Sequence, residues 1–495
     1  MKRKILLVVI AFSMVISGAF FISDATTNRA VATTVLPSEL FLFNPYRDID
    51  FATIGRYRAS LHNHTFNSDG FSSMQRSITR NAGIGFNILA FADHDFVSYP
   101  WDNRDVLAGN IIGPGPGGRD GHAFDVDMTN CHGLLAVQGN ELSWFHHIGS
   151  YFTDFEAGTH GSDITDEFSL LKQASAHADK AGRFTIKHPG RYTSWDANEQ
   201  LVWSDRPTAA QRWVTFTDMT PTEWYQNIFA SFSRVLAIEV FNQNDRYAND
   251  RRTYDQIMTG IMPARPVWLM ANDDNHSNHY GVNVNVMLMP AGSVSEPEGI
   301  DEFRKSFERG AFFAKSFGGG AIPENLEIPE FGGQLGSRWN YVPVVEDIII
   351  DEITGNIELR ASQHTHIEWI TEGGVVAGAG NRINFRTNPL IRGYVRGVLT
   401  NRCRVDGTLI ATTLMQPFGV GPYDADSWFF YFTGQPSNAP SNNGNGNNNG
   451  NNGDNNNGYP YPIPNGRCGS GSVTAGVVFF GLGVLGFVMF AVKKD

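Results

Sequence analysis

The sequence predicts an α/β fold over most of the chain, followed by a region of short β-strands. Apolar runs typical of buried strands alternate with helical patterns up to about residue 320. From residue 325 onward the predicted strands are separated by Gly and Asn turns, and no helical period is present. Polar side chains of the kinds that bind metals follow strand after strand, and barrels of parallel strands place their active sites at that end. We therefore expect a barrel-like domain over residues 33–324 and a β region over residues 325–435.

The hydrophobic patterns place the individual elements. The clearest predicted helix is 166–181, where Thr165 can cap the first turn and Gly182 ends the pattern. Further helices are expected at 72–82 and 300–308. The predicted strands of the first region are 57–61, 87–92, 134–137, 184–187, 235–238 and 267–271. Those of the β region are 348–350, 357–360, 367–370, 391–398 and 409–414.

Composition limits the partners of the protein. The 495 residues include 38 basic and 50 acidic side chains, for a net charge of -12. Long nucleic acids are held by basic surfaces, so this balance argues against such a partner but not against a small anionic substrate. The three cysteines, Cys131, Cys403 and Cys468, are too few for a disulfide framework. Cys131 with Cys403 is the one pairing that we consider.

Both ends of the chain predict export and membrane attachment. Residues 1–32 read as a signal peptide with a basic start and an uncharged apolar run, although the run could also remain as an uncleaved anchor. Residues 436–466 are rich in Asn, Gly and Pro and predict a disordered linker. Residues 473–492 carry no charge and predict a transmembrane helix, with a buried core helix as the alternative. The lysines in residues 493–495 favour a cytoplasmic tail. We expect a single-pass protein of the cell membrane with its catalytic domain outside.

Histidines and carboxylates gather between residues 62 and 276 in a pattern typical of metal binding. His62 and His64 point the same way along an extended chain, so both imidazoles can bind one ion. Each candidate alone could be an ordinary loop or surface residue, but the set repeats at strand ends. Six imidazoles and three carboxylates suit Zn, Mn or Fe better than Ca or Mg. The candidates are His62, His64, Asp69, His94, Glu141, His147, His188, Asp274 and His276.

The order and local contexts of these residues resemble the polymerase and histidinol phosphatase (PHP) family of metal-dependent phosphoesterases. The resemblance covers about residues 55–320. The matching motifs are His62-x-His64 with Ser68-Asp69-Gly70, Ala92-Asp93-His94, Gly139-x-Glu141 with His147-Ile148-Gly149, His188-Pro189 and Asp274-x-His276.

This resemblance implies a distorted seven-stranded β/α barrel that holds two or three divalent ions. It assigns His62, His64, Glu141 and Asp274 to one ion, and Asp69, His94 and His276 to a second. Glu141 would bridge to a third ion, completed by His147 and His188. The implied reaction is phosphoester hydrolysis, in which metals lower the pKa of a bound water and offset phosphoryl charge.

Three further charged residues lie outside the candidate ligand set. Lys187 or Arg191, on either side of His188, could contact the phosphate, or either could be ordinary surface charge. We count Arg191 with Glu141 and Asp274 as catalytic candidates. Glu239 resembles a recurrent family position, which we interpret as structural rather than as a ligand.

The predicted function is metal-dependent hydrolysis of a small phosphorylated substrate, a phosphomonoester or a phosphodiester, at the outer cell surface. Two alternatives stay open. One is metal-dependent hydrolysis of a non-phosphate bond, and the other is a non-catalytic metal-containing protein whose β region binds a partner. The sequence leaves the substrate, the metals and the oligomeric state undetermined.

Overall fold

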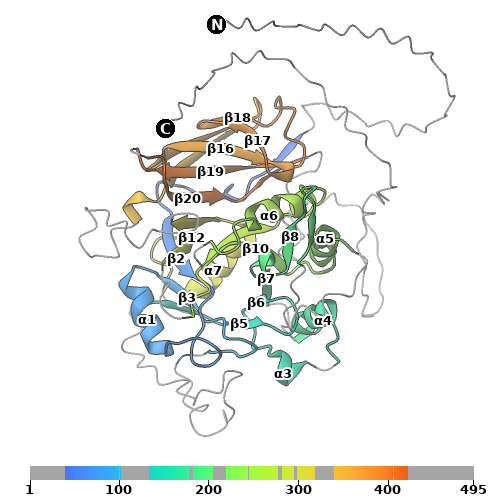
Figure 1. Ribbon diagram of the computed structural model, residues 1–495. Helices are drawn as coiled ribbons and strands as arrows, with labels where there is room; N and C mark the ends of the chain where they lie inside the picture. Colours follow the sequence, from blue (N-terminus) through green and yellow to red (C-terminus); the bar gives the residue numbers. More distant parts are fainter. Residues whose placement is uncertain are drawn as a thin grey trace, which may run out of the picture. The chain divides into compact units, whose positions relative to one another are not determined.

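The computed structural model gives a mixed α/β fold (Figure 1). It describes residues 40–99, 101, 133–161, 163–177, 182–204, 219–243, 245–276, 281–294, 298–317, 339–404 and 406–421. The predicted signal peptide, linker, transmembrane helix and tail lie outside these residues, as does Cys131. Within the described residues Cys403 is a free thiol. Because Cys131 lies outside them, the pairing of Cys131 with Cys403 stays a prediction. None of the helices in the described ranges has the length and apolar character needed to cross a membrane.

The first sheet begins with three parallel neighbours. They are β2 (Gly55–Ser60), β3 (Ile88–Ala90) and β4 (Leu135–Val137). Helix α1 (Met74–Gly83) connects β2 to β3, and the Ser73 side chain caps it by accepting a backbone N–H. All residues of β3 and β4 are buried, as expected for strands covered on both faces.

A second, five-stranded sheet follows in the order β11-β10-β7-β6-β5. Strands β7, β10 and β11 are parallel neighbours, whereas β6 runs antiparallel to both β5 and β7. The strands are β5 (Gly139–Leu142), β6 (Ile148–Tyr151), β7 (Arg183–Ile186), β10 (Val235–Asn242) and β11 (Trp268–Asn272). Only Gln138 separates β4 from β5, so one sheet leads directly into the other.

Helices and short elements surround the second sheet, and its largest apolar core includes residues of α4, α5 and α6. Predicted helix 166–181 is present as α4, although residues 178–181 lie outside the described part. The elements are α3 (Ala157–His160), α4 (Glu167–His177), η3 (Pro189–Arg191), β8 (Thr193–Trp195), β9 (Leu201–Trp203), α5 (Pro221–Ser231) and α6 (Asp250–Met258).

The described strands form two sheets that are linked by isolated bridges, Asn63 with Asn275 and His94 with Glu141, and not one continuous closed barrel. Strand β12 (Asn283–Met289) returns to pair antiparallel with β2, and α7 (Glu298–Arg309) connects it to β13 (Phe312–Phe317). Asn285 of β12 contacts Ala271 of β11 through its side-chain amide. The amide oxygen accepts a hydrogen bond from the backbone N–H of Ala271 at 3.0 Å, and the amide nitrogen donates to the backbone carbonyl of Ala271 at 2.8 Å. This amide therefore links β12 to β11 where no backbone ladder joins them.

The C-terminal strands extend the first sheet, because β20 pairs with β13. Pairing continues from β20 through β19 to β21 and the N-terminal β1. One apolar core joins these strands to a separate three-stranded sheet of β14, β15 and β18. The strands are β1 (Phe41–Phe43), β14 (Val344–Asp351), β15 (Asn356–Ser362), β16 (His366–Thr371), β17 (Val375–Ala379), β18 (Arg382–Asn384), β19 (Tyr394–Arg402), β20 (Leu409–Met415) and β21 (Phe418–Gly421), with η6 (Glu372–Gly374) between β16 and β17.

Candidate metal centre

The nine candidate ligands converge, because most of them lie at or just beyond strand ends that face the same region. His62 and His64 follow β2, His94 follows β3, His188 follows β7, and Asp274 and His276 follow β11. Glu141 lies within β5 instead of after a strand. His188 and Asp274 adopt positive φ angles of 23° and 46°. Such conformations cost on the order of 1–3 kcal/mol and gather at functional sites, where the surrounding structure enforces them.

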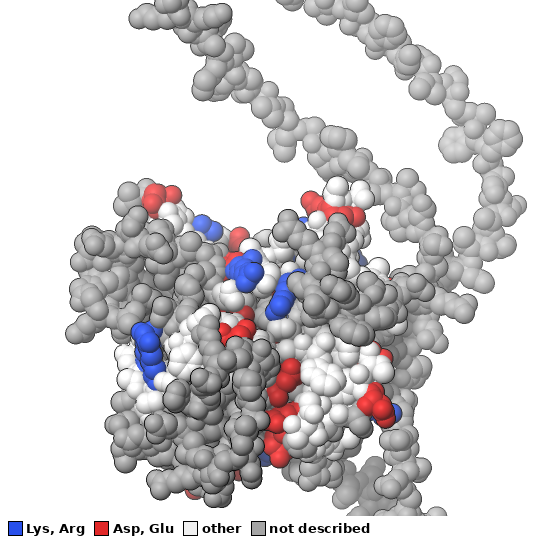
Figure 2. Space-filling model, turned by 60° about the horizontal axis from the view of Figure 1, so that its bottom comes forward, with Lys and Arg blue, Asp and Glu red and all other residues white. Residues whose placement is uncertain are grey.

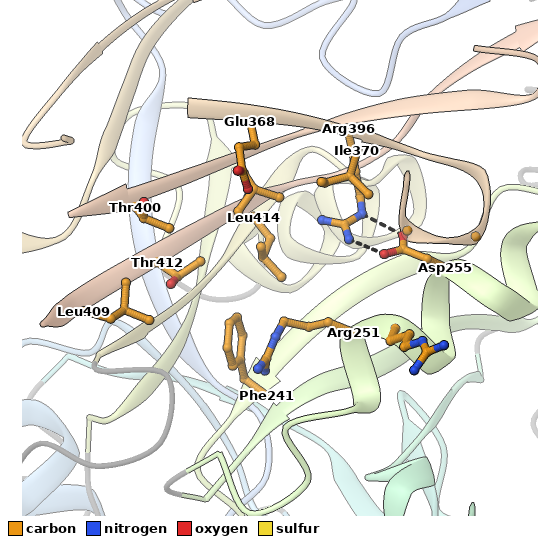
Figure 3. Close-up of a pocket in the computed structure, with 14 residues that line it drawn as sticks. Phe241, Arg251, Asp255, Glu368, Ile370, Arg396, Thr400, Leu409, Thr412 and Leu414 are labelled. Atoms are coloured by element: carbon orange, nitrogen blue, oxygen red, sulfur yellow. Dashed lines mark hydrogen bonds and ion pairs between the residues drawn. The ribbon is translucent and has the colours of Figure 1, made fainter. Parts of the chain in front are cut away.

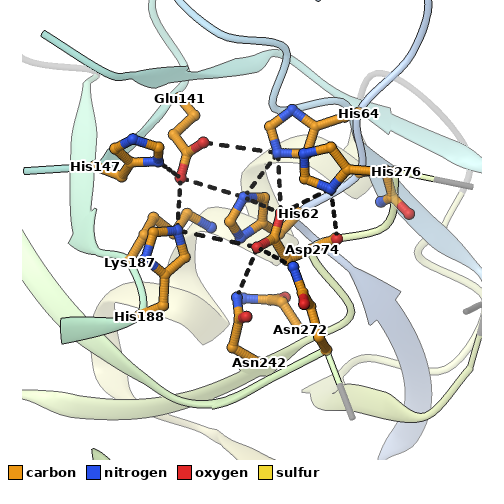
Figure 4. A network of polar contacts seen from close by, with 12 residues as sticks. His62, His64, Glu141, His147, Lys187, His188, Asn242, Asn272, Asp274 and His276 are labelled. Carbon is orange, nitrogen blue, oxygen red and sulfur yellow. Dashed lines mark hydrogen bonds and ion pairs between the residues drawn. The ribbon is translucent and has the colours of Figure 1, made fainter. Parts of the chain in front are cut away.

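Glu141 contacts five of the candidate histidines, and Figure 4 shows its carboxylate between His147 and His64. Its Oε1 is 3.3 Å from Nε2 of His62, 3.1 Å from Nδ1 of His147 and 3.4 Å from Nε2 of His188. Its Oε2 is 3.0 Å from Nδ1 of His94 and 3.6 Å from Nε2 of His64. The two oxygens therefore face two different sets of imidazoles, which is the geometry needed to bridge cations.

A deep group combines His62, His64 and Asp274, whose donor atoms lie within 4.8 Å of one another. Oδ1 of Asp274 is 3.3 Å from Nε2 of His62 and 3.1 Å from Nε2 of His64. Its Oδ2 accepts hydrogen bonds from Asn242 at 3.2 Å and Gln243 at 3.1 Å, which fix the carboxylate. These three residues, with Glu141, are the set that the resemblance assigns to one ion.

An outer group combines Asp69, His94 and His276. Asp69 lies 3.4 Å from Nε2 of His94 and 3.1 Å from Nε2 of His276. Their side chains are 48%, 18% and 29% exposed, whereas Glu141 is fully buried. His64 also belongs to this group by distance, so it lies between the deep and outer groups. Solvent thus reaches the cluster from the side of Asp69.

His147 and His188 meet the cluster through the same oxygen of Glu141. The grouping by distance places His147 with His94 and Glu141, and His188 with His62 and Glu141. The structure therefore brings all nine candidates together. Their individual assignments to three ions stay predictions.

The chemistry of the donor set fits divalent transition metals. Both oxygens of Glu141 and Oδ1 of Asp274 are buried and receive no hydrogen bond from the described residues. Burial alone raises the pKa of both carboxyls, but the surrounding histidines lower each pKa well below its usual value. Buried carboxylates that stay charged are normally paired or bound to metals.

Two imidazoles lie in the state that binds metal. Burial lowers the pKa of His64 to about 3 and that of His147 to about 4, although nearby carboxylates oppose the shift. Both rings are therefore neutral at pH 7, and a neutral imidazole offers a lone pair to an ion. The anionic carboxylates and neutral imidazoles together form a suitable ligand set for Zn, Mn or Fe.

Glu239 orients two of the predicted ligands from behind. Its Oε1 lies 3.0 Å from Nδ1 of His62, a position that would accept a hydrogen bond from Nδ1 and leave Nε2 for a metal ion. Its Oε2 accepts from the backbone N–H of His188 at 3.2 Å. The amides of Asn242 and Asn272 also donate to it, at 2.9 and 2.8 Å. These two amides escaped the sequence analysis, because Asn at a strand end is also common in turns.

Lys187 and Arg191 differ in position. Lys187 is fully buried, and its Nζ donates to the hydroxyl of Tyr151 at 2.9 Å and lies 3.7 Å from Glu239. It therefore sits behind the ligands, a position that fits neither a phosphate contact nor the ordinary surface charge considered from the sequence. Arg191 is partly exposed, and its Nη1 lies 3.2 Å from Nε2 of His147. Only Arg191 of this pair lies beside the cluster on a partly open face.

Asp93 organises the loop that carries His64 and Asp69, a role that the sequence motif did not reveal. Its carboxylate accepts from the backbone N–H and the hydroxyl of Thr65, at 2.6 and 2.7 Å, and from Ser68 at 2.8 Å. Gly70 allows the same loop to fold tightly, since a Cβ there would lie 2.5 Å from the backbone carbonyl of His64. The Ser68-Asp69-Gly70 motif is thus explained by local geometry as well as by ligand chemistry.

Comparisons with known proteins give distant structural matches. No family description and no curated protein matches the chain. A solved two-domain protein from Bacteroides vulgatus, described as containing a predicted PHP-like metal-dependent phosphoesterase, is 13% identical, with a TM-score of 0.36 over 74% of this chain and 96% of its own. An amidohydrolase from Chromobacterium violaceum is 14% identical (TM-score 0.27; 44% and 88% covered). A protein described as a metal-dependent phosphoesterase from Bifidobacterium adolescentis is 14% identical (TM-score 0.24; 45% and 89% covered). At these scores the likeness does not establish a family or a reaction.

Proposed function

We propose that the protein is a metal-dependent hydrolase that cleaves a phosphoester bond, and that its α/β region is a distorted barrel of the PHP type. The observation that carries this proposal is the position of Glu141. Its two buried oxygens face five imidazoles at 3.0–3.6 Å and take no hydrogen bond from the described residues. A site built only for packing would pair such oxygens with amide or hydroxyl donors.

The residues divide into holding and orienting roles. The nine ligands would hold two or three divalent ions, with Glu141 shared between them. When bound, such ions supply a nucleophilic water near neutral pH and offset charge on the phosphoryl oxygens. Glu239 and Asp93 keep His62 and the His64 loop in place.

The substrate would approach from the side of Asp69, His94 and His276, which is the exposed side of the cluster. Arg191 lies next to His147 and could neutralise a phosphoryl oxygen there. The described Lys and Arg side chains are scattered over the face shown in Figure 2 and form no continuous patch there. The net charge of -12 supports a small phosphorylated substrate over a long nucleic acid.

We also propose that the enzyme works outside the cell, attached to the membrane by residues 473–492. The uncharged length of that segment and the basic, apolar start of the chain support this location.

Metal analysis and hydrolysis assays on the purified chain test the proposal. We expect two or three Zn, Mn or Fe ions per chain, and turnover of p-nitrophenyl phosphate or bis-p-nitrophenyl phosphate that a chelator abolishes and metal restores. p-Nitrophenyl acetate serves as the non-phosphate comparison. Metal-dependent turnover of the acetate alone would favour the non-phosphate alternative. Absence of transition metal after loading would overturn the assignment.

A further inference from the structure

A cavity of about 410 Å³ lies apart from the metal centre, between α6 and the sheet face formed by β16, β19 and β20 (Figure 3). None of the nine candidate ligands lines it. Its volume falls within the range typical of small-molecule sites, about 300–1,000 Å³. It therefore offers room for a second ligand where the α/β region meets the β region.

Strand alternation explains which side chains enter the cavity. Arg396, Val398 and Thr400 occupy alternate positions of β19 and line it, whereas Leu399 between them packs into the apolar core of the β region. In β16, Ile370 lines the cavity while the neighbouring Trp369 joins the same core. One face of the sheet is thus an ordinary apolar core, and the other face carries an arginine and threonines.

Arg396 presents an unused donor to this space. The residue is 3% exposed, and its Nε and Nη2 donate to Asp255 of α6 at 2.9 and 2.5 Å. Its Nη1 is buried and has no hydrogen-bond partner among the described residues, and the same holds for Oγ1 of Thr400. Figure 3 shows the third guanidinium nitrogen directed away from Asp255, toward the side of Glu368 and Leu414. A buried donor without an acceptor is costly, so a bound acceptor would stabilise it.

The guanidinium groups around the cavity are paired with carboxylates, and Nη1 of Arg396 is the nitrogen that lacks a partner among the described residues. Arg251 is held in place by Asp245 at 2.6 and 2.8 Å and by the ring of Phe241, 4.5 Å from its Cζ. Arg252 pairs with Glu199 at 3.0 Å, and Arg396 pairs with Asp255. The carboxylate of Glu368 also lines the cavity, so it disfavours a ligand with more than one negative charge.

We propose that this cavity binds a small molecule whose oxyanion, a carboxylate or a phosphoryl group, accepts a hydrogen bond from Nη1 of Arg396. The apolar part of the ligand would pack against Ile370, Val398 and Leu414, which line the same space. Arginine is well suited to this recognition, because its planar guanidinium matches the geometry of carboxylate and phosphate groups.

Calorimetric titration of the full metal-loaded chain tests the proposal with three probes of similar size. Benzoate carries a carboxylate, phenylphosphonate carries a phosphoryl group, and benzyl alcohol is the neutral comparison. Val398→Trp fills the cavity, and Val376→Trp is the matched control, because Val376 lies on β17, is 49% exposed and does not line the cavity. Arg396→Lys keeps a cation for Asp255 but removes the guanidinium nitrogen Nη1, and it covers the case in which the tryptophan variant fails to fold.

We expect one anionic probe to bind with 1:1 stoichiometry, and benzyl alcohol to bind at least tenfold more weakly. Val398→Trp or Arg396→Lys should raise its Kd at least tenfold, whereas Val376→Trp should leave it within twofold. Preference for benzoate or for phenylphosphonate would identify the oxyanion. Binding that survives both cavity variants, such as phenylphosphonate held at the metal centre, would overturn the proposal, as would equal binding of the neutral probe or no binding of any probe.

Discussion

Glu141→Gln is the substitution that tests the metal centre most directly. The change keeps the size of the side chain but replaces one of two buried oxygens with an NH₂ group. Five imidazole nitrogens lie 3.0–3.6 Å from those oxygens, split between Oε1 and Oε2. An amide nitrogen cannot bind a cation, so one of the two sets of imidazoles loses the carboxylate oxygen that faces it.

The expected effect is loss of at least one ion per chain and a fall in kcat/KM of about 10²- to 10³-fold. This corresponds to about 2.7–4 kcal/mol of transition-state stabilisation, similar to the loss of one well-placed electrostatic group. The backbone of β5 should not change, since Gln fits the same volume. Circular dichroism and the unfolding midpoint will show whether the fold is intact.

The assay compares metal content and p-nitrophenyl phosphate turnover of this variant with those of Glu308→Gln. Glu308, on α7, is also a largely buried glutamate, with an exposure of 8%. It pairs with Arg183 of β7 at 2.5 Å and does not belong to the ligand set. The control should keep its ions and its activity. If Glu141→Gln retained all its ions and a kcat/KM within threefold of the unaltered chain, the bridging role derived from the geometry would be refuted.

Three further substitutions have defined outcomes. Gly70→Ala should displace the loop that carries Asp69, because the new Cβ would lie 2.5 Å from backbone atoms of His64. Occupancy of the ion held by Asp69, His94 and His276 should fall at least tenfold, and so should activity. The control Gly83→Ala should leave the metal content unchanged, because a Cβ at Gly83 would have no atom within 4 Å. Glu239→Gln should weaken metal affinity about 10–100-fold in a competition titration with a chelator, because His62 loses its orienting carboxylate; unchanged affinity would contradict this role. Burial lowers the pKa of Lys315 to about 7. Between pH 7 and 10 the unfolded chain therefore binds more protons than the folded one, and the free energy of unfolding should rise with pH by a contribution on the order of 1–4 kcal/mol. In Lys315→Met this contribution should vanish in urea unfolding at several pH values, and an equal slope in both proteins would count against it.

The sequence was informative about local features of the site. The strand ends that carry His94 and His188 could be predicted because a buried strand leaves a recognisable apolar run. The nine candidates could be chosen by residue type, and the structure brings all of them together. Helix α4 could be recognised from its apolar period and its first-turn acids, and its start differs from the prediction by one residue.

The same local reading was misleading wherever the outcome depended on residues far apart in the chain. Lys187 was expected to be able to reach a phosphate, yet the fold directs it to Tyr151 and Glu239 behind the ligands. A distorted barrel was expected from the alternation of strands and helices, and the described strands form two sheets linked by the isolated bridges Asn63–Asn275 and His94–Glu141. The pattern of one strand carries no information on such contacts.

By itself, the sequence determined which side chains could bind metal and which segments form strands, because residue chemistry and hydrophobic period are local properties. Only the tertiary structure decided that Glu141 faces two sets of imidazoles, that β20 joins the sheet through β13, and that Arg396 leaves one N–H in a cavity beside α6. These features arise from packing between elements separated by tens to hundreds of residues. Strand pairing and side-chain direction at such distances are set by the complete core, so they become visible only when the whole chain has folded.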